Sequence, residues 1–83
     1  MNRKQLAELL KYASPYSILV VTWQNKIIEL KCPFKVEVKN EIGELIVGEV
    51  VVVELVKTST NLKAVFIING NAYYYFHFII LID

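Results

Sequence analysis

The chain has 83 residues, of which 55% are hydrophobic, and its nine basic and eight acidic side chains leave a formal net charge of +1. This length predicts a single domain, 1–83, and this composition excludes an intrinsically disordered chain. The near-neutral charge argues against a strong nucleic-acid binder, because affinity for phosphate comes largely from clustered Lys and Arg. The apolar content exceeds what one small core readily hides, so part of it is expected in an interface or a binding face.

Residues 3–12 are predicted to form an α-helix. Apolar residues recur there at i, i+3, i+4 and i+7, along one stripe: Leu6, Leu9, Leu10 and Ala13. Pro15 is expected to end the helix, because proline disfavours helical geometry at the residue before it. Three turns are too short to be stable alone, so the stripe is expected to dock on the sheet that follows.

Two strands, 17–23 and 26–32, are predicted to form a hairpin around a two-residue loop, Gln24-Asn25. This register divides the hairpin into two faces. The uncharged face is the predicted core side: Leu19, Val21, Trp23, Ile28 and Leu30. The other face carries Ile18, Val20, Thr22, Ile27, Glu29 and Lys31.

The middle of the chain predicts two further strands. Residues 34–39 alternate apolar and charged side chains, which indicates one buried face and one wet face. Residues 44–57 include four consecutive valines, so we expect a long central strand that is apolar on both faces, with Gly48 as a bulge or bend.

The last two predicted strands, 62–69 and 72–82, are joined at Asn69-Gly70-Asn71, since Asn and Gly tolerate the positive φ of a tight turn. The second of these strands alternates two sets of rings. One face is more uniformly apolar and is assigned to the core: Val65, Ile67, Tyr74, Phe76 and Phe78. The other is expected to look outward: Phe66, Tyr73, Tyr75 and His77.

The stretch Leu45-Ile46-Val47-Gly48-Glu49-Val50-Val51-Val52-Val53 resembles the second-strand signature of bacterial SH3-like small barrels, over residues 33–83. The expected fold is therefore mainly β: a small five- to six-stranded antiparallel SH3-like barrel with one N-terminal α-helix. The aromatic motifs of the proline-peptide-binding members are absent, so the resemblance implies architecture and not that ligand. A helix followed by five bent strands is also similar to Sm-like barrels, although their glycine and basic signature is missing.

The outward rings Phe66, Tyr73, Tyr75 and His77 form the candidate partner-binding face. We expect it to bind a protein partner or a second copy of the chain, in a non-catalytic interaction module. The alternative is an Sm-like or related binder of single-stranded nucleic acid, with bases stacking on Tyr73 and Tyr75 beside Lys63.

The sequence contains few residues that could support catalysis. Cys32 and His77 are the only cysteine and histidine, so neither an internal disulfide nor a Cys/His metal cluster is expected. No phosphate-binding loop or nucleophile motif is present, so we expect no enzyme activity, metal or cofactor. The lone thiol and the lack of a recognisable signal peptide predict a cytoplasmic protein. The uncharged tract 64–82 is interrupted by Asn69-Gly70-Asn71, so no membrane partner is expected.

Overall fold

Strand pairing organises the chain in the computed structural model, which describes the backbone of residues 5–82 and the side chains of Leu9 and residues 14–82. The strands run in chain order as β1 (Gln5–Ser14), β2 (Ser17–Thr22), β3 (Ile27–Lys31), β4 (Phe34–Val38), β5 (Val50–Val53), β6 (Leu55–Thr58), β7 (Ala64–Ile68), β8 (Asn71–Tyr74) and β9 (Phe78–Ile82). A short 3-10 helix, Tyr75–His77, separates β8 from β9.

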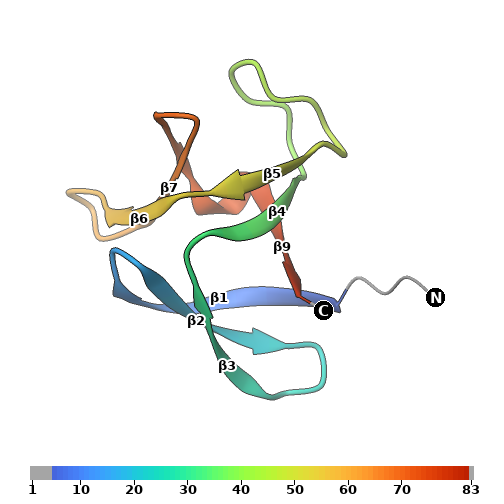
Figure 1. The fold of residues 1–83 in the computed structure, drawn as a ribbon, viewed down its shortest axis with the longest axis vertical. Helices are drawn as coiled ribbons and strands as arrows, with labels where there is room; N and C mark the ends of the chain where they lie inside the picture. Colours follow the sequence, from blue (N-terminus) through green and yellow to red (C-terminus); the bar gives the residue numbers. More distant parts are fainter. Residues whose placement is uncertain (1–4, 83) are drawn as a thin grey trace.

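The strands form two antiparallel sheets. One is six-stranded, in the order β3-β2-β1-β9-β4-β5, and the other is three-stranded, in the order β6-β7-β8. Figure 1 shows the chain passing from the first sheet to the second where β5 runs into β6. The core lies between the sheets and consists of aliphatic and phenylalanine side chains: Ile18, Val20, Phe34, Val36, Val38, Leu45, Val51, Val53, Val56, Ala64, Phe66, Ile68, Phe78, Ile80 and Ile82.

The mainly β character is confirmed, but the predicted SH3-like barrel with an N-terminal α-helix is wrong. Residues 5–82 contain no α-helix, and the six-stranded sheet ends at two different strands, β3 and β5, so the strands do not close into a barrel. Closure would require the first and last strands of one sheet to pair with each other.

The predicted helix, as far as residues 5–12 are described, is part of β1. This strand pairs with β2 on one side and with β9 on the other, so it occupies the middle of the larger sheet. Its register with β2 shifts between Leu9 and Lys11 and again between Tyr12 and Ser14. Each bulge adds a residue to a strand. Apolar spacing along a bulged strand therefore departs from two and resembles the three- and four-residue spacing of a helix.

The β2–β3 hairpin is confirmed, but its loop has three residues and not two. The Thr22 N–H donates to the Lys26 carbonyl at 2.8 Å, and Asn25 adopts φ = +63° between them. A change of one residue in register turns side chains to the opposite face. In β2 the core side is therefore Ile18, Val20 and Thr22, and Trp23, predicted to be buried, is 67% exposed. The β3 residues Ile28 and Leu30 do face the core as predicted.

Strand 34–39 is confirmed as β4, with Phe34, Val36 and Val38 buried and Lys35 exposed. It follows β3 through a cis Cys32–Pro33 peptide bond. It pairs with β9 on one side and with β5 on the other, where Val36 lies opposite Val51.

The predicted long strand 44–57 is wrong. Residues 44–49 form a loop, and the strand positions are divided between β5 and β6, which belong to different sheets. The expected bulge at Gly48 is confirmed. Gly48 has φ = +90°, its N–H donates to the Val38 carbonyl at 2.8 Å, and the Val38 N–H donates to the Glu49 carbonyl at 2.8 Å. This is a glycine bulge, in which two residues of one strand face one residue of its partner.

The C-terminal hairpin is confirmed at Asn69-Gly70, where both residues have positive φ and Ile68 pairs with Asn71. The prediction of one continuous strand over residues 72–82 is wrong. The 3-10 helix interrupts it after Tyr74, and β9 then leaves the smaller sheet to pair with β1 and β4.

Candidate binding surface

Phe66, a member of the predicted partner-binding face, is fully buried, with 0% of its surface exposed. Its ring meets Phe34 edge-to-face, with centroids 5.5 Å apart, and lies 5.9 Å from the ring of Phe78. Phe34 and Phe78 belong to the six-stranded sheet and Phe66 to the three-stranded one. Phe66 therefore joins the two sheets and is not available to a partner.

Tyr73 and Tyr75 are half-buried and pack against the same core. The Tyr73 ring lies edge-to-face on Phe78 at 6.0 Å. It also covers Gly43 in the β4–β5 loop, where an added Cβ would come within 3.2 Å of Tyr73 Cε1. Tyr73 thus helps hold this loop against the smaller sheet.

His77 is half-buried at the end of the 3-10 helix. Its carbonyl oxygen accepts hydrogen bonds from the N–H groups of Lys39 at 2.8 Å and Asn40 at 3.2 Å. Its Nδ1 atom is buried and has no hydrogen-bond partner among the described residues. The ring lies 4.7 Å from that of Phe76. The backbone of His77 thus has a clear structural role at the junction of β4 and β9.

Two aromatic rings on the side of the three-stranded sheet opposite to Phe66, those of Tyr74 and Phe76, are exposed. Tyr74 is 38% exposed and Phe76 39% exposed, and the two rings stack with centroids 5.4 Å apart and 11° between their planes. The Lys63 Nζ lies 5.7 Å from the Phe76 centroid, within the range of a cation–π contact. We call the following residues the outer aromatic face: Lys63, Val65, Ile67, Tyr74 and Phe76.

Strand register explains how the outer aromatic face is assembled. Val65 pairs with Tyr74 across β7 and β8, and Ile67 pairs with Ala72. Side chains alternate along a strand, so these residues lie on the side opposite to Phe66. Val65 and Ile67 are half-buried and provide an apolar base beside the stacked rings.

The predicted orientation of this hairpin is therefore inverted, except at Phe78, which is buried as predicted. The cause of the inversion lies in the passage from β5 to β6. Val51 and Val53 face the core in β5, but in β6 the core-facing residue is Val56, so the alternation slips by one residue near Glu54. Val56 pairs with Phe66, and this pairing brings Phe66 and Tyr73 to the inside. Both faces of the hairpin are apolar, so alternation in the hairpin alone does not distinguish inside from outside.

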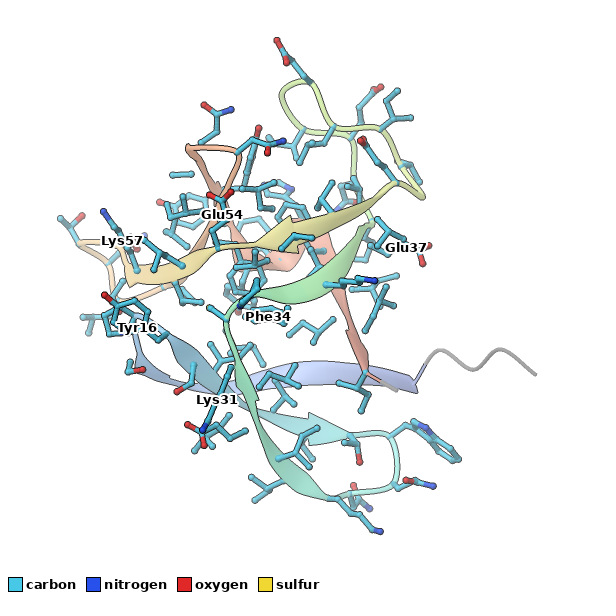
Figure 2. The ribbon with its side chains drawn as sticks, viewed as in Figure 1. Tyr16, Lys31, Phe34, Glu37, Glu54 and Lys57 are labelled. Carbon is cyan, nitrogen blue, oxygen red and sulfur yellow. The ribbon has the colours of Figure 1, made fainter. Side chains whose placement is uncertain are left out.

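Charged side chains border the outer aromatic face. Lys57 pairs with Val65 in the register of β6 and β7 and is exposed, as are Lys63 and Glu54. Figure 2 shows Lys57 on β6 and Glu54 immediately before the start of β6. Two ammonium groups beside apolar rings give this face a mildly positive rim.

The lone thiol, Cys32, lies beside the β1–β2 turn. Cys32 is half-buried, its Sγ lies 3.9 Å from the Pro15 carbonyl oxygen, and burial raises the pKa of its thiol. A raised pKa disfavours the reactive thiolate. The Glu49 Oε1 accepts a hydrogen bond from the Ile46 N–H at 3.1 Å. Among the side chains that the structure describes, those of Leu9 and residues 14–82, no group of three or more His, Cys, Asp or Glu is placed to hold a metal ion.

Comparison with known proteins adds no relative: no family model, curated protein or solved structure matches the chain significantly. Within the part of the chain described by the structure, no helix has the length and hydropathy that crossing a bilayer requires.

Proposed function

We propose that the protein is a non-catalytic interaction module that binds another protein through the outer aromatic face. The observation that carries this proposal is the stacked Tyr74–Phe76 pair, because each ring keeps more than a third of its surface in solvent. Large rings with this exposure are typical of protein interfaces, where they supply most of the binding energy. The lone, half-buried Cys32 fits a reducing compartment, so we place the module in the cytoplasm.

The surroundings of the ring pair also favour a protein partner. Val65 and Ile67 give an apolar centre, and Lys57 and Lys63 give a polar rim. This arrangement of apolar centre and charged rim is common in specific protein interfaces. The partner is expected to present an apolar side chain for the rings and acidic groups for the two lysines.

Site-specific photo-crosslinking in the native cell tests this proposal. A photoreactive phenylalanine analogue placed at Tyr74 is expected to form a discrete cross-linked protein product. The same analogue at Trp23, an equally bulky exposed position in the β2–β3 turn, is the matched control and is expected to give none. Adding Phe76→Ala to the Tyr74 probe is expected to reduce the product at least several-fold. Equal products at both positions, or a product insensitive to Phe76→Ala, would contradict the proposal.

Single-stranded nucleic acid is the second candidate ligand. It is favoured by the Tyr74–Phe76 stack with the Lys63 ammonium 5.7 Å from Phe76, because bases stack on aromatic rings beside cations. Its stacking residues then differ from the predicted Tyr73 and Tyr75, which pack on the core. A fluorescence titration with single-stranded RNA distinguishes the candidates. Binding that weakens steeply with salt supports nucleic acid, and no binding at ~50 mM salt excludes it.

A further inference from the structure

Strand β5 forms one edge of the six-stranded sheet, and the glycine bulge determines which of its backbone groups face outward. The bond from the Val38 N–H to the Glu49 carbonyl makes that pair a hydrogen-bonded one. Hydrogen-bonded and non-hydrogen-bonded pairs alternate along an antiparallel ladder. Val51 and Val53 are therefore bonded to β4, and the N–H and C=O groups of Val50 and Val52 point to the open edge.

The open part of this edge is short and has clear limits. At its far end the Glu54 N–H already donates to the Ile67 carbonyl at 2.8 Å, so β7 covers the edge from there on. At its near end the turn Ile46–Glu49 takes the chain out of the strand. Between these limits, the outward groups of Val50 and Val52 have no partner among the described residues.

Features that usually protect an edge strand are missing from β5. Val50–Val53 contains no charged residue and no proline, and the outer-face side chains of Val50 and Val52 are 46% and 43% exposed. The opposite edge strand, β3, carries exposed Glu29 and Lys31. Charges of this kind discourage strand addition, so the sheet is protected at one edge and open at the other.

We propose that this edge binds the same edge of a second copy of the chain, so that two β5 strands pair antiparallel about a twofold axis at Val51. In this register Val50 lies opposite Val52 of the second copy, and Val52 lies opposite Val50. Every outward N–H and C=O group of these residues then finds a partner. The sequence around the axis is a run of valines, so both copies present the same surface, as a twofold interface requires.

Other antiparallel registers satisfy fewer groups. Pairing Val52 with Val52 brings Val50 opposite Glu54, whose N–H is already bonded to Ile67. Pairing Val50 with Val50 brings Val52 opposite Gly48, whose N–H is already bonded to Val38. The register centred on Val51 is the one that uses no group already engaged within the chain.

Charge also suits this register. In β4, Lys35 pairs with Val52 and Glu37 pairs with Val50. A row of side chains across the joined sheets therefore runs from Lys35 through Val52 to Val50 and Glu37 of the second copy. Each such row has a lysine at one end and a glutamate at the other. Glu54 comes level with Gly48 of the other copy, so no two acidic side chains face each other across the axis.

Sedimentation equilibrium from micromolar to millimolar chain concentration tests the proposal. The average mass is expected to rise toward about twice the 9.6 kDa of one chain. Val52→Pro removes an N–H that points to the open edge, so it is expected to hold the mass at one chain over this range. Glu29→Pro places the same residue type at the other edge and is expected to dimerise like the wild type. A wild type that stays monomeric at millimolar concentration, or a Val52→Pro variant that still dimerises, overturns the proposal.

If the Val52→Pro variant does not fold, amide hydrogen exchange of the wild-type protein tests whether the β5 edge is the dimer interface. The Val50 and Val52 amides are expected to exchange at least tenfold more slowly at the concentration where the mass doubles than at the lowest one. The Glu29 amide, at the other edge, is expected to exchange at the same rate at both concentrations. A doubled mass without slower exchange at Val50 and Val52 places the interface elsewhere and overturns the proposal.

Discussion

At the scale of single residues, Phe66 connects the two sheets. It sits between Phe34 and Phe78 of the larger sheet and is fully buried, whereas Tyr74 on the next strand points the other way. The two aromatic residues come from neighbouring strands of one hairpin, but they contribute to different properties of the protein. Phe66 contributes to stability, and Tyr74 belongs to the surface that we propose binds a partner.

Replacing Phe66 by alanine is expected to lower the free energy of unfolding by about 3–5 kcal/mol, because the change leaves a cavity between the sheets. A chain of this length has a total of about 4–12 kcal/mol, so the loss is a large fraction of its stability. Tyr74→Ala is the matched control and is expected to cost less than about 1 kcal/mol. Urea unfolding followed by circular dichroism measures both. Equal losses in the two variants would contradict the assignment of inner and outer faces.

At the scale of elements, β1 shows how a strand with helical spacing is stabilised. It bonds to β2 on one side and β9 on the other, and three turns of isolated helix would have offered no comparable set of contacts. Without β1, the β2–β3 hairpin has no connection to β9 in this sheet. The need to pair two flanking strands therefore outweighs the helix propensity of residues 5–12.

Proline substitution distinguishes a central strand from an edge strand. Glu8 pairs with Val21 inside the six-stranded sheet, so Glu8→Pro is expected to abolish cooperative folding. Glu29→Pro lies in the edge strand β3 and is expected to leave a folded protein. Thermal unfolding followed by near-ultraviolet circular dichroism gives the comparison. A well-folded Glu8→Pro variant would show that β1 is not an internal strand.

At the scale of the whole molecule, the two sheets share one core. Phe66 from β7 packs on rings of β4 and β9, and the Val56 N–H of β6 donates to the Pro15 carbonyl in the β1–β2 turn at 2.9 Å. Figure 1 shows the smaller sheet lying beside the larger one along this junction. Neither sheet buries its inner face without the other.

This shared core predicts that the molecule unfolds in one cooperative step. Native-state hydrogen exchange is expected to give the same opening free energy for Val20 in β2 and Phe66 in β7, within about 1 kcal/mol. Both residues are fully buried and lie in different sheets, so they report on the two sheets independently. A Phe66 amide that opens several kcal/mol more easily than Val20 would show that the smaller sheet unfolds alone.

The local pattern of the sequence determined the features that depend on neighbouring residues. The alternation in Phe34–Val38 predicted the buried side of β4, Asn69-Gly70 predicted the tight turn, and Gly48 predicted the bulge. Each of these follows from the geometry of a few consecutive residues, so no distant contact is needed to decide it. The predicted strands of the β2–β3 hairpin were recognised for the same reason.

Tertiary structure decided the features that depend on distant strands. A three-residue loop at Asn25 turned Trp23 outward, bulges in β1 concealed a strand within a helical pattern, and a slip near Glu54 placed Phe66 inside and Tyr74 outside. The physical reason is that β2, β5 and β7 carry no charge on either face, so alternation in these strands shows that two faces exist without showing which one is buried. Which face is buried depends on the sheet that packs against the strand, and the residues of that sheet lie far away in the chain.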